Sequence, residues 1–308
     1  MENNSVLVVK NLSVLIKERF LVKNASFSVD KGQCVGIIGE DKSGKTSLIK
    51  AIAGALPITD GSVVLDGENV CPGSPALKHI SICLDPPVFF KFQTVLNNMQ
   101  FLSGLSNNND KEKIIKVLNK FNLAHKIKDK VKTLSFYEKK LMALALAFLT
   151  EPKLLLLDEP FKGLPEEKID EIKAYIREIQ AKGTAIIIST RSIERLQDMT
   201  NLFMFMEKRA ITKILTYTQC ETLSDKTYAF VAVKYPHYCG KAIMDEFQLK
   251  VKLLDNKVLF EADEDTTAEI VRYFSKNHIA VYKAGYLSKQ SEKIFGNLAP
   301  YYKEEEQS

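Results

Sequence analysis

The sequence has few features of secreted, metal-binding or disulfide-stabilised proteins. Only five of its 308 residues are cysteine, and none of them stands in a Cys-x-x-Cys spacing. An odd number of scattered cysteines argues against a disulfide framework and a zinc site, and it indicates a reducing compartment. The first residues also lack the basic start and apolar core of a secretion signal. We therefore expect a cytoplasmic chain.

Long hydrophobic runs and blocks of like charge are missing as well. The longest apolar runs, residues 141–149 and 154–157, are far shorter than the roughly 20 residues that span a bilayer as a helix. The net charge of +5 is spread along the chain, so no basic cluster suggests a nucleic-acid partner. These features predict a soluble globular protein that does not bind nucleic acid.

Strand-like and helix-like runs alternate up to about residue 220. Alternating apolar residues predict antiparallel strands at 6–9, 25–29 and 62–65. Runs rich in β-branched residues or leucine predict buried parallel strands at 34–38, 80–84, 154–158 and 185–189. A helical stretch is expected from about 94 to 149, and a helix over 166–180. The predicted fold class is therefore α/β with a parallel core.

The pattern changes after about residue 220. Strand, helix, hairpin, helix and strand are predicted at 228–233, 239–247, 250–260, 266–276 and 279–284. This β-α-β-β-α-β order is typical of a split βαβ arrangement. We predict a first domain over residues 1–219, with a helical subdomain at about 86–150. A small accessory α+β domain is predicted over 220–308.

Residues 39–46 read Gly-Glu-Asp-Lys-Ser-Gly-Lys-Thr between a predicted strand and a predicted helix. Glycines at this spacing let backbone N–H groups face phosphates at the helix N-terminus. The lysine reaches the β- and γ-phosphates, and the threonine hydroxyl can ligate Mg²⁺. The sequence therefore predicts a nucleotide site formed by Gly39, Glu40, Asp41, Lys42, Ser43, Gly44, Lys45, Thr46 and Ser47.

Two adjacent carboxylates, Asp158 and Glu159, end the predicted strand that begins at Leu154. Asp158 can hold Mg²⁺ beside Thr46, and Glu159 can orient or deprotonate a hydrolytic water. The alternative is that the two acids only solvate a turn. Their position after an intact phosphate loop favours the catalytic interpretation.

Residues 39–46 and 154–160 resemble the Walker A and Walker B motifs of an ABC-transporter ATPase, and Leu134-Ser135 lies where that family keeps its signature. The resemblance covers about residues 5–215. It implies a P-loop NTPase core with antiparallel and helical subdomains, ATP and Mg²⁺ as cofactors, a second ATPase subunit and a separate membrane permease. Residues 287–295 are similar to the ending of ATPases that serve ABC-2-type exporters. The implied location is the inner face of the cell membrane, through the permease.

The signature departs from the family's Leu-Ser-Gly-Gly-Gln. It reads Leu134-Ser135-Phe136-Tyr137-Glu138, so the two glycines have become aromatic. The resemblance implies that Ser135 contacts a nucleotide on the opposite subunit. Ser135 and Glu138 also form a capping-box pattern, which predicts a clean helix start.

Two further positions depart from the pattern. Asp85 stands where the family has a glutamine that touches Mg²⁺, and it can either ligate the cation or cap a turn before Pro86. Arg191 stands where a switch histidine is expected. It can clamp a phosphate as part of the catalytic set with Lys45 and Glu159, but its charge is permanent.

Three functions fit these residues. The preferred one is an ATPase subunit of a membrane exporter, which hydrolyses ATP slowly and pairs with a different ATPase subunit. A homodimer would carry every departure in both sites. The second is a regulatory ABC subunit that closes on ATP as a clamp without turnover. The third, an ABC protein acting on ribosomes or DNA, is disfavoured because the chain has one cassette and no basic cluster.

Overall fold

Two compact units make up the chain, divided between Tyr217 and Thr218. The structure is a computed structural model that describes residues 5–104, 111–196, 198–200, 202–224, 228–254 and 256–286. The sequence-based division lies two residues later in the chain. The stretch 287–295, which resembles exporter ATPases, is outside the described residues.

The first unit is built on a ten-stranded sheet in the order β5-β4-β1-β2-β10-β9-β3-β8-β7-β6. One half is antiparallel and contains β1 (Ser5–Ile16), β2 (Arg19–Asp30), β4 (Asp60–Leu65) and β5 (Glu68–Asn69). The other half is parallel and contains β3 (Cys34–Ile38), β6 (Ile80–Cys83), β7 (Leu154–Asp158), β8 (Ala185–Thr190) and β9 (Leu202–Glu207). The four predicted parallel strands are thereby confirmed.

The strand β10 (Ala210–Thr216) joins the two halves. It pairs antiparallel with β9 and meets β2 through Ala210 and Lys23. The sequence patterns did not predict β9 or β10. The six residues of β9 do not alternate strictly between buried and exposed positions, and none of the seven residues of β10 is buried.

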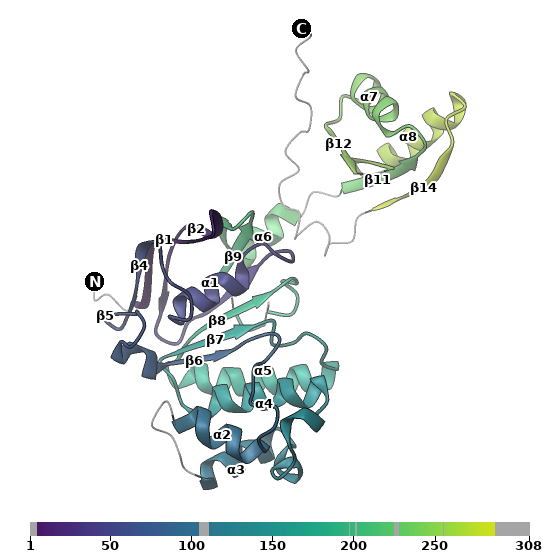
Figure 1. The fold of residues 1–308 in the computed structure, drawn as a ribbon. Helices are drawn as coiled ribbons and strands as arrows, with labels where there is room; N and C mark the ends of the chain where they lie inside the picture. The colour runs from purple at the N-terminus through teal and green to yellow at the C-terminus, as the bar shows by residue number, and fades with distance from the viewer. Residues whose placement is uncertain are drawn as a thin grey trace. The chain divides into compact units, whose positions relative to one another are not determined.

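Helices cover both faces of the parallel half. On one face α1 (Lys45–Ile52) packs against β2 and β7 within the main apolar core. On the other, α4 (Phe136–Leu149) contacts β6, and α5 (Glu166–Ala181) lies beside it in Figure 1. α2 (Val95–Gly104) and α3 (Lys111–Lys120) pack on α4 away from the sheet. Short 3₁₀ turns span Pro75–His79, Ala124–Lys126 and Val131–Thr133.

The second unit is a four-stranded antiparallel sheet in the order β12-β13-β11-β14. It contains β11 (Tyr228–Val233), β12 (Val251–Leu254), β13 (Lys257–Glu261) and β14 (Val281–Tyr286), together with α7 (Pro236–Phe247) and α8 (Glu264–Lys276). α6 (Tyr217–Ser224) begins at the last residue of the first unit.

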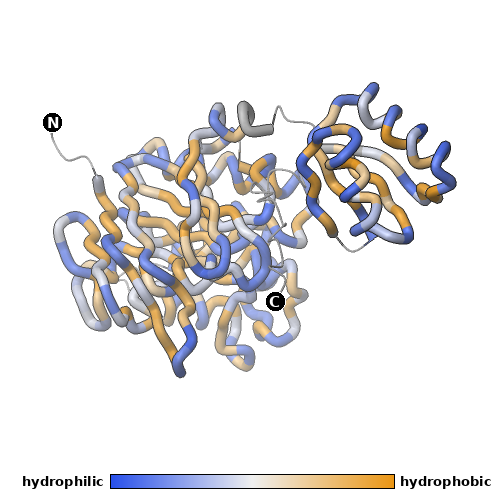
Figure 2. Tube along the Cα trace, turned by 90° about the horizontal axis from the view of Figure 1, so that it is seen from above, coloured by the Kyte–Doolittle hydropathy of each residue, from blue (hydrophilic) through white to orange (hydrophobic). Residues whose placement is uncertain are grey.

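Alternate residues of the second sheet form a separate core with both helices. Val231 and Val258 from the strands meet Ile243 of α7 and Ile270 of α8. Because strand side chains alternate between faces, this shared cluster puts α7 and α8 on the same face. The hydrophobic colour follows the strands of both units in Figure 2.

Because the central strands are buried, truncating a core side chain on one of them should lower the free energy of unfolding strongly. Leu156 of β7 is fully buried in the main core. Leu156→Ala should lower the free energy of unfolding by about 2–5 kcal/mol, because it removes apolar contacts and leaves a cavity. Denaturant unfolding of the full chain measures this cost. Leu15→Ala is the control, since Leu15 is 38% exposed; an equal loss in both variants would contradict the assigned core.

Candidate nucleotide-binding site

The predicted phosphate loop joins β3 to α1, and its shape depends on two glycines. Gly44 caps α1 with φ +113°, a conformation that side chains rarely adopt. A Cβ on Gly39 would lie 2.4 Å from the backbone oxygen of Met206, so no larger residue fits there without movement. Lys42 also has a positive φ of +63°. The backbone therefore turns tightly ahead of the helix N-terminus.

The turn between β9 and β10 supports this loop. The backbone N–H of Arg209 donates to the carbonyl of Ser43 at 2.9 Å, and the Arg209 carbonyl accepts from Lys23 at 2.7 Å. Sequence reasoning missed these contacts because both strands were unpredicted. The turn between β9 and β10 thus holds the loop, in addition to β3 and α1.

Lys45 is buried and its ammonium group lies inside the loop. Its Nζ donates to the carbonyls of Gly39 at 2.6 Å and Glu40 at 3.0 Å. It is also 3.5 Å from Oε1 of Glu159. The structure therefore brings the predicted lysine and the predicted glutamate together.

Asp158 lies at the centre of the site with 1% of its surface exposed. Its Oδ2 accepts from the Thr46 hydroxyl at 2.7 Å, and its Oδ1 accepts from the Ser189 hydroxyl at 2.6 Å. Thr46 and Asp158, two of the three magnesium ligands that the sequence predicts, are direct neighbours. Ser189 was missed as a site residue, although it ends a strand that the sequence predicted.

Glu159 is aimed by an unusual backbone conformation. Its φ is +46°, which is uncommon for a residue other than glycine. Its N–H lies 3.0 Å from the Ser189 hydroxyl and 3.2 Å from the Ser189 carbonyl. Burial raises the pKa of its carboxyl group above the usual value, and the charge of Lys45 offsets this only in part.

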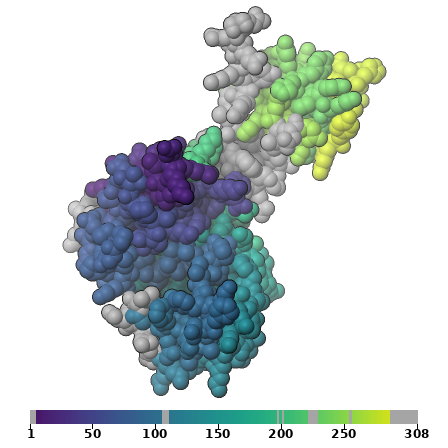
Figure 3. Space-filling model, in the orientation of Figure 1, coloured from purple at the N-terminus to yellow at the C-terminus, as the bar shows by residue number. Residues whose placement is uncertain are grey.

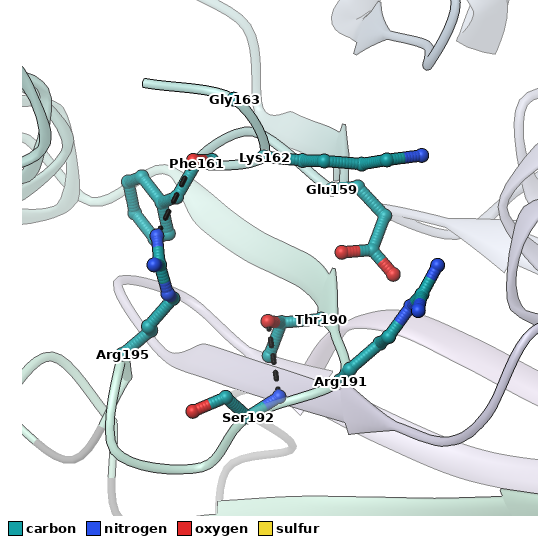
Figure 4. Close-up of a pocket in the computed structure, with 8 residues that line it drawn as sticks. All are labelled: Glu159, Phe161, Lys162, Gly163, Thr190, Arg191, Ser192 and Arg195. Atoms are coloured by element: carbon teal, nitrogen blue, oxygen red, sulfur yellow. Dashed lines mark hydrogen bonds between the residues drawn. The ribbon is translucent and has the colours of Figure 1, made fainter. Parts of the chain in front are cut away.

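A cavity of about 300 Å³ opens beside Glu159. In Figure 4 the Glu159 carboxylate points into this space, with the Arg191 guanidinium close to it. Lys162, Thr190 and Arg195 also line the cavity. Arg195 donates to the carbonyl of Phe161 at 3.3 Å. The wall is therefore rich in positive charge around a single carboxylate.

Arg191 contacts the phosphate loop. Its guanidinium lies 2.6 Å from the carboxylate of Asp41 in an exposed ion pair. The two residues are 150 positions apart in the chain, and no local sequence pattern indicates that they pair. Arg191 thus faces the nucleotide site and neutralises an acid of the loop.

Asp85 is held between two lysines. Oδ1 is 3.0 Å from Lys140 Nζ, and Oδ2 is 3.0 Å from Lys162 Nζ. Burial acts to raise its pKa, but the hydrogen bonds and charges of the lysines outweigh burial and hold the pKa below the usual value. Both oxygens of this candidate metal ligand therefore have lysine partners.

Ser135 stands at the N-terminus of α4. Its side chain accepts from the N–H of Glu138 at 3.1 Å, and the Glu138 carboxylate accepts from the Ser135 N–H at 2.8 Å. The predicted capping box is confirmed. Phe136, the residue after Ser135, is 52% exposed.

The residues of the loop fit a nucleotide phosphate. The Ser43 hydroxyl is buried and has no hydrogen-bond partner among the described residues, and an unpaired buried hydroxyl is costly. The helix N-terminus and Lys45 supply donors for an anion. Thr46 and Asp158 supply the oxygen ligands that Mg²⁺ prefers.

Residues 22–162 match the family model described as ABC transporter. This range holds the phosphate loop, Asp158 and Glu159. The matched part of the first unit is similar to an ABC transporter ATP-binding domain, and the unit has the fold of such a domain.

Proteins similar to this chain include bacterial transport proteins. It is 26% identical over 305 residues to the uncharacterized ABC transporter ATP-binding protein YhcH of Bacillus subtilis (strain 168), covering 98% of this chain and 99% of that protein. It is 26% identical over 220 residues to the lantibiotic transport ATP-binding protein SrtF of Streptococcus pyogenes, covering 71% and 95%. It is 25% identical over 297 residues to the bacitracin transport ATP-binding protein BcrA of Enterococcus faecalis, covering 95% and 96%.

Solved structures share the fold of the ABC ATPase domain. A structure of an ATP-binding subunit of an ABC transporter superposes with a TM-score of 0.65 at 23% identity, over 71% of this chain and 92% of that one. A nucleotide-free ATP-binding cassette from an ABC transporter gives a TM-score of 0.61 at 25% identity, over 71% and 94%. The predicted ABC ATPase fold is confirmed.

Within the part of the chain that the structure describes, every helix is too short or too polar to cross a membrane.

The Ser189 hydroxyl donates to Asp158 and accepts from the Glu159 N–H, so its removal should destabilise the fold. Ser189→Ala leaves the buried Asp158 carboxylate without one donor and the Glu159 N–H without one acceptor. We expect the free energy of unfolding to fall by about 1–3 kcal/mol. Denaturant titration measures it, with Ser26→Ala as control, because Ser26 makes its hydrogen bonds at an exposed site. A loss no larger than in the control would contradict the assigned network.

Proposed function

We propose that this ATP-binding subunit couples ATP binding and slow hydrolysis to transport by a separate membrane permease, as part of an exporter. The observation that carries the proposal is the junction of Thr46, Asp158, Lys45 and Glu159 in one largely buried cluster. The lantibiotic and bacitracin transport names of similar proteins support the export function. The matches to YhcH and BcrA also span the second unit.

The loop from Gly39 to Ser47 would hold the phosphates of ATP, and Thr46 and Asp158 would hold Mg²⁺. Bound Mg-ATP supplies a phosphoanhydride bond that is polarised for attack by water. Lys45, which now contacts two carbonyls of its own loop, is in reach of the β- and γ-phosphates. Glu159 orients the water and accepts its proton, and its raised pKa suits a base.

Slow hydrolysis is proposed from the replaced motifs. Ser135 uses its hydroxyl to cap α4, and aromatic side chains follow it. The N–H groups of Ser135 and Glu138 already donate within this chain, so a partner's nucleotide would receive fewer backbone donors from this segment. Arg191 is a fixed cation that pairs with Asp41, so it cannot exchange protons as a histidine does. We infer a heterodimer in which the second ATPase subunit supplies the missing groups.

An apolar surface on the helical subdomain suits the permease. Phe90 and Phe101 are 51% and 57% exposed, and their ring centroids lie 5.1 Å apart. Val88 and Phe92 in the same segment are exposed as well. The colour scale of Figure 3 draws this segment in blue. The buried Asn98 side chain fixes the segment by hydrogen bonds to the N–H and carbonyl of Phe90 at 2.8 and 3.1 Å. We propose that cytoplasmic helices of the permease bind here, which would place the chain on the inner face of the cell membrane.

The alternative function is a clamp that binds ATP without turnover. The Arg191–Asp41 pair and the capped Ser135 favour it, because both use site residues for contacts within this chain. The intact Lys45, Asp158 and Glu159 favour hydrolysis.

Steady-state ATPase activity of the chain purified with its membrane partner separates these functions. Glu159→Gln should lower turnover by about 10²- to 10⁴-fold, because it removes the base, while labelled ATP is still retained. Glu171→Gln is the matched control on the exposed face of α5, and it should leave turnover unchanged. If the wild type shows no turnover but retains ATP in a way that depends on Lys45, the result would contradict the proposed transport ATPase. It would support the clamp that binds ATP without turnover.

A further inference from the structure

Lys140 is a completely buried lysine in α4, shortly after Ser135 in the sequence. It lies in the first turns of α4 with 0% exposure. Its Nζ is 3.0 Å from Asp85 Oδ1 and 2.5 Å from the backbone carbonyl of Glu159. Buried charges are tolerated when they are paired and hydrogen-bonded. One ammonium group therefore connects α4, the segment after β6 and the end of β7.

Asp85 also contacts Lys162, the residue at which the turn after Glu159 closes. Its second oxygen accepts from Lys162 Nζ at 3.0 Å. The backbone N–H of Lys162 in turn donates to the Glu159 carbonyl at 3.2 Å. The Glu159 carbonyl thus accepts from both lysines, and Asp85 pairs with both.

The Glu159 peptide needs such support because its φ is +46°. Strained backbone conformations persist only when surrounding contacts hold them. Ser189 contacts the N–H side of the residue, and Lys140 with Lys162 contacts the carbonyl side. The direction of the Glu159 carboxylate into its cavity follows from these two anchors.

We propose that Lys140, with Asp85 as its counter-ion, is the positioning residue that aims Glu159. Lys140 does not touch the reacting atoms; it acts through the peptide that carries the carboxylate. Because it belongs to α4, a movement of the helical subdomain changes the geometry of Glu159 directly. The inference rests on the proposed hydrolytic role of Glu159.

If Lys140 only stabilised the fold, its variants would behave differently from those of a positioning residue. A single and a double variant distinguish these two roles. Lys140→Met alone leaves the buried Asp85 with one partner fewer, and it should lower Tm by roughly 10 °C. The double variant Lys140→Met with Asp85→Asn removes both buried charges, so Tm should recover most of that loss. A structural pair would recover turnover together with Tm.

The test measures Tm, ATP affinity and turnover of the full chain with its partner. In the double variant we expect ATP affinity within about 3-fold of wild type and turnover lowered about 10- to 100-fold, as for a misplaced catalytic group. Lys173→Met is the matched control, because Lys173 is a buried lysine of α5 paired with Asp198 at 2.9 Å; turnover there should stay unchanged. Wild-type turnover in the double variant would overturn the proposal.

A second readout does not depend on turnover. Amide hydrogen exchange at Glu159, Phe161 and Lys162 should accelerate about 10-fold in the double variant, because the Glu159 peptide has lost an anchor, while exchange of β8 stays the same. Unchanged exchange at these residues would overturn the proposal. If the wild type hydrolyses no ATP, the proposed function fails, and the exchange result alone decides whether Lys140 positions Glu159.

Discussion

The site depends on the hydrogen bonds that the buried carboxylate of Asp158 accepts. A charge with 1% exposure is stable only when donors satisfy it, and the donors come from two other segments. Thr46 belongs to the phosphate loop and helix α1, while Ser189 belongs to the adjacent strand β8. Their hydrogen bonds fix the loop, β7 and β8 at one point. The direction of Glu159, the next residue, depends on the same junction.

Two charged residues near this junction, Asp85 and Arg191, each have a partner of opposite charge. Arg191 pairs with Asp41, and Asp85 pairs with Lys140. The first pair is exposed, so its contribution to stability is small, about 1 kcal/mol or less. The second is buried, and breaking it by removing one partner costs about 3–5 kcal/mol. Asp85 and Arg191 therefore form two ion pairs of opposite charge beside the nucleotide site.

The sequence predicted the features that depend on local patterns. Continuous apolar runs identified β3, β7 and β8, and the glycine spacing identified the loop before α1. It did not predict β9 and β10, which support the loop through Arg209. Ser189 and Lys140 were missed for a related reason, because their partners are distant in the chain. Polar residues whose role depends on tertiary pairing carry no periodic signal.

Calorimetric titration of Mg-ATP into the full chain tests the central claim most directly. The cluster predicts one ATP per chain, with affinity lowered about 100-fold or more in Lys45→Met, because the charged contact to the phosphates is lost. Lys50→Met, on the last turn of the same helix, should bind as the wild type does. Equal affinity of wild type and Lys45→Met would contradict the assignment of the phosphate loop.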